Sequence, residues 1–190
     1  YFFKRIIKSA DLIVSISEHL KRVALQSGAN KNKVKIIPNG VDMANFSQDY
    51  SYGELSELGD RLGVKPDEKV LVTVSRLTHK NGLDSLLKAV AMLGQLSPQS
   101  RFKLVVAGEG EDKKKLIELT RNLNVREQVV FTGSISPHLL PKYLRIADVF
   151  VRPSRSEGLG SAFLEAMAAG LPVIGTRVGG IPDFLKDGET

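Results

Sequence analysis

The 190-residue sequence contains no cysteine. This absence excludes a disulfide framework and a thiolate metal site, and it fits a reducing compartment without requiring one. No apolar run approaches the roughly 18 residues that suggest a membrane-spanning helix. The three histidines are not spaced with acidic residues as metal ligands would be, so we predict no metal site at His19, His79 or His138.

Aromatic residues are also few, at 6% of the chain, and no nucleic-acid-binding motif occurs, so we expect no nucleic-acid partner. The net charge of +6 instead suits a polyanionic ligand or an anionic membrane surface. Near the start, Lys4, Arg5 and Lys8 stand among apolar residues. This pattern is compatible with a solvated helix face, with a helix that packs on other protein, and with a peripheral membrane contact.

Apolar runs alternate with helical patterns along most of the chain. From residue 66 onward, strands are expected at residues 70–74, 102–107, 129–131, 147–151 and 173–174. Helices are expected between them, at residues 82–96, 111–123 and 141–146 and around Glu165. Apolar strands joined by helices predict right-handed βαβ units. The predicted fold is therefore α/β, with a Rossmann-like parallel sheet and helices on both faces.

The first 65 residues follow a less regular pattern. Strands are expected at residues 12–16 and 34–37, with a helix between them that is capped by Ser17. Residues 42–65 are polar and weakly periodic, and they resemble a connector with one short helix at residues 55–62. We therefore divide the chain into 1–41, 42–65 and 66–190.

A strand, a loop and a helix between residues 147 and 173 carry the most information. The loop holds Glu157, Gly158 and Gly160, and Glu165 lies in the middle of the helix. Glycines at a helix start let backbone N–H groups approach a ligand, and the helix N-terminus favours negative charge. The two carboxylates are at most about 12 Å apart along a helix axis. This arrangement suits a nucleotide sugar, which has a diphosphate between two hydroxyl-bearing groups.

The pattern of Glu157, seven residues and Glu165, followed by Ala166-Met167-Ala168-Ala169-Gly170-Leu171-Pro172-Val173, resembles the signature of retaining glycosyltransferases of family 4. These enzymes have the GT-B architecture. The resemblance implies that residues 1–41 are the tail of an N-terminal, acceptor-side domain. Residues 66–190 would then be the nucleotide-sugar-binding C-terminal domain, truncated at its end, with most of the N-terminal domain outside this sequence.

The resemblance also implies roles for individual residues. Glu157 would accept hydrogen bonds from the transferred sugar, and Glu165 from the ribose. The diphosphate would be held by the backbone of Gly158, Leu159, Gly160 and Ser161. A glutamate pair also occurs in glycoside hydrolases, but an anion site between the two carboxylates does not help to cleave a neutral glycoside.

A second motif follows the strand at residues 70–74, at the edge where ligands bind in open α/β sheets. Arg76 can hold phosphate oxygens in a bidentate manner. The family motif resembles Gly-Arg-Leu, three residues, Lys-Gly, but here Asn81 takes the lysine position and Lys80 comes one residue earlier. Three alternatives stay open: Lys80 reaches the phosphate, Asn81 gives a neutral hydrogen bond, or Lys80 is simply solvated. The resemblance implies catalytic roles for Arg76, Lys80 and Glu157.

Two later loops complete the expected donor site. In the family, loops like those at Gly108 and Ser134 lie beside the nucleotide and near its base. The sequence does not specify the base, so the donor is expected to be a UDP-, GDP- or ADP-hexose, and no cofactor is expected. GT-B enzymes of this kind use a helix dipole and basic side chains in place of a metal ion.

The activity implied is transfer of a hexosyl unit to an acceptor hydroxyl with retention of anomeric configuration. The acceptor, a glycan or a lipid-linked molecule, would bind through the N-terminal domain. The family suggests polysaccharide biosynthesis and a cytoplasmic location, with the inner face of the membrane as an option. Two alternatives are a GT-B-like nucleotide-sugar 2-epimerase and a non-catalytic sugar-nucleotide-binding subunit. The isolated fragment is expected to bind nucleotide weakly and to be inactive.

Overall fold

The computed structural model describes residues 2–190, so Tyr1 lies outside the described residues. Its internal contacts group the chain into two units. The sheet unit consists of Val41–Arg155 and Ala162–Thr176, and the N-terminal unit contains the chain up to Gly40 with Ser156–Ser161 and Arg177–Thr190. The predicted division into 1–41, 42–65 and 66–190 consists of three consecutive segments. The contacts instead group two later segments with the first 40 residues.

The sheet unit is built on five parallel strands, which confirms the predicted α/β class. Their order is β5-β4-β3-β6-β7. The bounds are β3 (Lys69–Val74), β4 (Phe102–Ala107), β5 (Val129–Gly133), β6 (Val149–Arg152) and β7 (Val173–Gly175). After β3, the chain forms β4 and β5 on one side of that strand and then crosses back to form β6 on its other side. This reversal between β3 and β6 is a topological switch point, next to which ligands bind in open α/β sheets.

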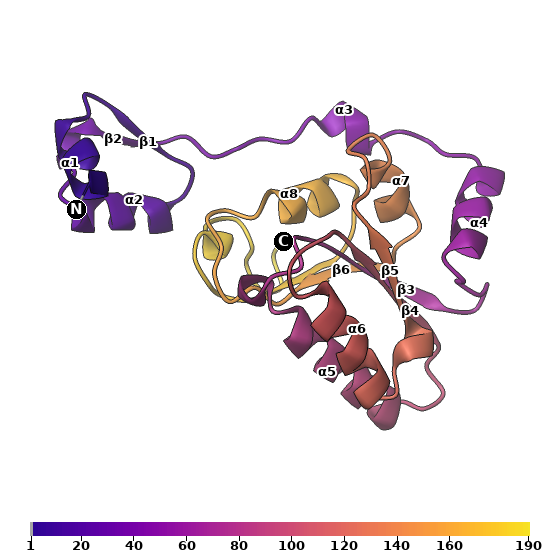
Figure 1. Ribbon diagram of the computed structural model, residues 1–190. Coiled ribbons are helices and arrows are strands. Elements are labelled where there is room, and N and C mark those ends of the chain that lie inside the picture. Colours follow the sequence, from indigo (N-terminus) through magenta and orange to yellow (C-terminus); the bar gives the residue numbers. More distant parts are fainter. Residues whose placement is uncertain (1) are drawn as a thin grey trace. The chain divides into compact units, whose positions relative to one another are not determined.

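Helices cover both faces of this sheet (Figure 1). On one face lie α5 (Leu83–Leu96) and α6 (Lys113–Asn122), and on the other lie α7 (Leu140–Arg145) and α8 (Ser161–Ala168). Helical spacing predicts a buried apolar side of α5 made of five residues. Four of them are buried against β4 and α6, Leu83, Leu86, Leu87 and Val90, whereas Leu93, near the end of the helix, is exposed. On the opposite face, the rings of Phe150 and Phe163 meet edge to face, with centroids 5.2 Å apart.

Residues 42–65 are more helical than the predicted connector. They form α3 (Met43–Phe46) and α4 (Tyr52–Arg61), where the sequence analysis expected one helix at residues 55–62. The start of α4 is fixed by a capping box, in which the Ser51 side chain accepts from the Glu54 amide and the Glu54 carboxylate accepts from the Ser51 amide. Leu58 and Leu62 are buried, and α4 packs against α7. A local capping signal therefore defines a helix in a segment with weak periodicity.

The N-terminal unit contains a two-stranded parallel sheet of β1 (Ile13–Ser15) and β2 (Val34–Ile36). Its helices are α1 (Phe2–Ser9) and α2 (Glu18–Gln26). Ser17 caps α2 as predicted, because its Oγ accepts from the Leu20 amide at 3.2 Å. Four 3-10 turns complete the described elements: η1 (Lys31–Lys33), η2 (His79–Asn81), η3 (Arg126–Gln128) and η4 (Ile181–Asp183).

Candidate functional site

A cavity of about 420 Å³ opens at the carboxyl ends of β3, β4 and β5. Because these strands are neighbours and parallel, the residues that follow each of them reach the same edge of the sheet. The structure thereby brings together three predicted site residues, Arg76, Gly108 and Ser134. The remaining residues of the wall are Val74, Ser75, Ala107, Glu109, Gly110 and Ile135.

Part of the cavity wall is backbone, and two glycines make this possible. Gly108 has φ +143°, and a Cβ atom there would lie 1.9 Å from the carbonyl oxygen of Ser75. A Cβ atom at Gly110 would lie 2.3 Å from the carbonyl oxygen of Leu77. Backbone hydrogen bonds continue past the strand ends, from Ser75 N to Ala107 O (3.0 Å) and from Leu77 N to Glu109 O (2.9 Å). A side chain at either glycine would separate these segments.

Arg76 is exposed at this cavity and makes no ion pair within residues 2–190. Its backbone is held in place, since its carbonyl accepts from Thr78 N at 3.0 Å and from the Asn81 side chain at 2.5 Å. The guanidinium is therefore available to a ligand on a fixed loop. This is the arrangement expected of a phosphate-binding arginine.

Asn81, at the family's lysine position, does not line the cavity. It is 1% exposed, and its Oδ1 accepts from Arg152 Nη2 at 2.9 Å while its amide nitrogen donates to the Arg76 carbonyl. Both ends of this side chain thus bond to protein, so Asn81 holds the loop. Lys80 is exposed on η2 and does not line the cavity either. Of the two, only Lys80 has a side chain that is accessible to a ligand.

Ser75 is a site residue that the sequence analysis missed. It lines the cavity, and its Oγ is buried without a hydrogen-bond partner among the described residues. A buried hydroxyl in this state is costly unless a water or a ligand bonds to it. Glu109 was also missed; the residue lines the cavity, and its carboxylate pairs with Lys113. The sequence signal for both was their place directly beside Arg76 and Gly108.

The predicted loop from Glu157 to Ser161 precedes α8. Gly160 has φ +98°, as a glycine at a helix start allows. The Gly158 amide is occupied, because it donates to the carboxylate of Glu157 itself at 3.1 Å. For the amides of Leu159, Gly160 and Ser161, the described chain provides no acceptor. Three of the four predicted amides therefore have no acceptor among the described residues, and of these three residues Leu159 and Gly160 are buried.

Glu165 lies on α8 and is half-buried. Desolvation by burial raises the pKa of its carboxyl above the usual value of 4.5. A raised pKa in the folded state means that ionisation of Glu165 lowers stability. A ligand hydroxyl that donates to this carboxylate would offset part of that cost.

This pKa shift predicts a pH-dependent effect of Glu165→Gln. Well below pH 4.5 the carboxyl is neutral in both folded and unfolded chains, so variant and wild type should be equally stable there. As pH rises through the folded-state pKa, the wild type loses stability relative to the variant. Thermal unfolding from pH 4 to pH 8 measures this difference. Glu57→Gln, at an exposed position on α4, is the control. If the stability difference between Glu165→Gln and wild type does not change with pH, the raised pKa of Glu165 is contradicted.

The described residues contain no group of three or more His, Asp or Glu side chains placed to hold a metal ion. Within residues 2–190, none of the helices combines the length and hydrophobicity required to traverse a bilayer.

A doubly wound parallel sheet with a cavity at its carboxyl edge is the architecture of ligand-binding α/β proteins, nucleotide-binding ones among them. The family model described as Glycosyl transferases group 1 matches residues 57–190. The chain therefore belongs to this family of GT-B glycosyltransferases, which confirms the resemblance found in the sequence.

Several proteins are similar to this chain. An uncharacterized glycosyltransferase of Methanocaldococcus jannaschii is 36% identical over 92% of this chain and 44% of the relative. The alpha-monoglucosyldiacylglycerol synthase of Streptococcus pneumoniae is 33% identical over 92% of this chain and 39% of the relative. The crystal structure of Anabaena HepE with UDP and glucose matches with a TM-score of 0.85 at 24% identity, over 96% of this chain and 49% of HepE. The chain spans less than half the length of each of these proteins.

Proposed function

We propose that this chain supplies the donor site of a hexosyltransferase. The enzyme would move a hexosyl unit from a nucleotide diphosphate sugar to an acceptor hydroxyl, with retention of anomeric configuration. The observation that carries the proposal is the cavity at the ends of β3, β4 and β5. It is lined by closely packed backbone and by Arg76, which has no ion-pair partner in the part of the chain that the structure describes. Family membership and the UDP bound to HepE support it.

In this proposal, Arg76 binds the donor diphosphate and stabilises the negative charge that develops on the leaving nucleotide. Lys80 is the better candidate for the family's second cation, because the Asn81 side chain is bonded inside the loop. No metal ion or cofactor takes part.

The roles of Glu157 and Glu165 stay predictions. Glu157 would accept hydrogen bonds from the hexose and Glu165 from the ribose, and the amides of residues 159–161 would bind the diphosphate. The acceptor, a glycan or a lipid-linked molecule, would bind elsewhere in the full-length protein, with a cytoplasmic location and peripheral membrane contact. The relatedness to a diacylglycerol glycolipid synthase supports a lipid-linked acceptor.

The proposal predicts that the protein in its full natural length binds one of UDP, GDP and ADP more tightly than the other two, with no need for a divalent cation. Isothermal titration with and without EDTA measures this. The same nucleotide, carrying a hexose, should then support transfer to an acceptor, and NMR of the product should show the anomeric configuration of the donor. Binding of none of the three nucleotides would contradict the proposed function, and an inverted product would contradict retention alone.

The two alternative functions predict different results in this experiment. A 2-epimerase would convert the nucleotide sugar without any acceptor, and a non-catalytic subunit would bind the nucleotide without turnover. The family match favours the transferase, and no contact in the described structure favours either alternative.

A further inference from the structure

Two segments far apart in the sequence are joined next to the switch point between β3 and β6. One is the loop and turn at residues 76–85, and the other is the segment 152–155. The Arg155 amide donates to the Lys80 carbonyl at 2.7 Å. Gly82, with φ +69°, lies so close to Pro153 that a Cβ atom would be 1.9 Å from the Pro153 carbonyl oxygen. The segments are therefore in direct backbone contact.

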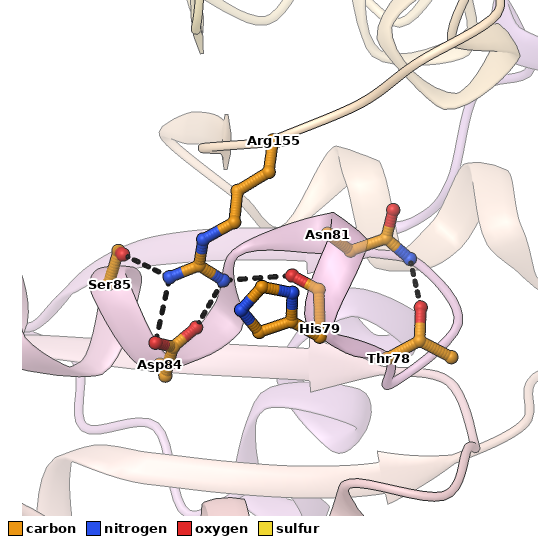
Figure 2. Close-up of polar contacts among 6 residues, drawn as sticks. All are labelled: Thr78, His79, Asn81, Asp84, Ser85 and Arg155. Atoms are coloured by element: carbon orange, nitrogen blue, oxygen red, sulfur yellow. Dashed lines mark hydrogen bonds and ion pairs between the residues drawn. The ribbon is translucent and has the colours of Figure 1, made fainter.

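The Arg155 side chain forms the polar part of this junction (Figure 2). Its guanidinium meets Asp84 in a bidentate pair, with Nη1–Oδ1 at 2.7 Å and Nη2–Oδ2 at 2.8 Å. The same group donates to the His79 carbonyl at 2.8 Å and to Ser85 Oγ at 3.0 Å. These contacts hold the pKa of Asp84 below its usual value, so the pair is ionised at neutral pH.

This geometry differs from that of an ordinary surface pair. Exposed ion pairs with one contact add little to stability. Here one planar group bonds both oxygens of a carboxylate, a backbone carbonyl of η2 and a side chain of α5, so it fixes orientation as well as distance. The Arg155 and Asp84 side chains are only 34% and 35% exposed. The turn that they hold carries Lys80 and ends the loop that starts at Arg76.

We propose that Arg155 and Asp84 form a positioning pair that fixes the loop 76–82 for recognition of the donor diphosphate. The pair acts from the outer side of the loop, while Asn81 holds its inner side through the Arg76 carbonyl and Arg152. Arg155 does not touch the donor in this proposal, which rests on the proposed function. Its loss should let the loop move, so the charges of Arg76 and Lys80 would be less well placed for phosphate.

The experiment compares wild type with Arg155→Ala, Arg155→Lys, Asp84→Ala and the double variant Arg155→Ala/Asp84→Ala in the full-length protein. Two ligands are compared: the nucleoside diphosphate (UDP, GDP or ADP) that the wild type binds, and the corresponding nucleoside. Their affinities are measured by NMR titration. For Arg155→Ala we expect about a tenfold loss of affinity for the nucleoside diphosphate and none for the nucleoside, which lacks the phosphates. Arg155→Lys should restore only part of the loss, because lysine cannot form the bidentate pair. The double variant Arg155→Ala/Asp84→Ala should lose no more than Arg155→Ala.

Arg101→Ala is the matched control, because Arg101 pairs with Asp67 in the same unit at an exposed position away from the cavity. Unchanged diphosphate affinity in Arg155→Ala would overturn the proposal, as would an equal loss for diphosphate and nucleoside. Amide hydrogen exchange gives a second measurement that needs no ligand. In Arg155→Ala, exchange at Asn81, Gly82 and residue 155 should be faster than in Arg101→Ala, and unchanged exchange would refute a fixed loop.

If the wild type binds none of the three nucleotides, the proposed function fails, and the exchange measurement still decides whether the pair fixes the loop. If the wild type binds a nucleotide and Arg155→Ala binds it equally well, only the positioning pair fails.

Discussion

Arg76→Ala is expected to lower the affinity for a nucleoside diphosphate by about a hundredfold. Hydrogen bonds to charged groups contribute about 1.5–3 kcal/mol, and 1.4 kcal/mol corresponds to a factor of ten. Arg76 lines the cavity and has no acidic partner within the described residues, so its full charge is available to phosphate. Isothermal titration of wild type and variant with the nucleotide that binds best measures the loss.

Arg76→Lys separates charge from geometry at this position. Lysine keeps the positive charge but lacks the planar fork, so we expect it to recover about half of the lost binding free energy. Arg121→Ala is the control, because Arg121 is exposed on α6 and pairs with Glu118. If Arg76→Ala binds as tightly as Arg121→Ala, the cavity at the strand ends is not the diphosphate site.

That Arg76 reaches this edge of the sheet could be predicted from the sequence, because it follows a strand whose position depends on the sheet alone. Apolar runs bounded by turn residues identified all five strands, and parallel strands place their carboxyl ends at one edge. Gly108 and Ser134 follow neighbouring strands and therefore meet Arg76 at the same cavity. Helical spacing likewise identified the buried side of α5.

The direction of polar side chains in the loops could not be predicted in this way. In Lys80-Asn81 both residues are polar, and no local pattern says which one turns inward. The structure shows that a tertiary bond decides it, because Asn81 Oδ1 accepts from Arg152, which is 71 residues away in the sequence. The pairing of Arg155 with Asp84 is equally remote. Such contacts depend on the packing of β6 beside β3, which only the fold supplies.

Two features were within reach of the sequence but were missed. The Ser51 and Glu54 spacing is that of a capping box, which fixes the start of α4 in the segment predicted to be a connector. The hydroxyl of Ser75 stands directly before Arg76, at the end of the same strand. Its buried and unpartnered state, however, results from tertiary packing and is visible only in the structure.

Gly108→Ala is expected to destabilise the protein by about 3 kcal/mol and to disrupt the cavity. Two costs combine, because φ +143° strains any other residue and the new Cβ atom would overlap the Ser75 carbonyl oxygen. For a chain of this size, the loss corresponds to a fall in the melting temperature of about 10 °C. Thermal unfolding measures it, and titration should show weaker nucleotide binding below the transition, because β3 and β4 must separate at their ends.

Gly94→Ala is the matched control, and its expected effect on stability has the opposite sign. Gly94 lies in α5, and a Cβ atom there would meet nothing within 4 Å. Alanine is the better helix former by about 0.5–1 kcal/mol, so this variant should be slightly more stable than wild type and should bind nucleotide normally. The same chemical change thus separates close backbone packing at the cavity from the general effect of replacing glycine. A Gly108→Ala variant as stable as Gly94→Ala would show that β3 and β4 do not meet as closely at the cavity as the structure places them.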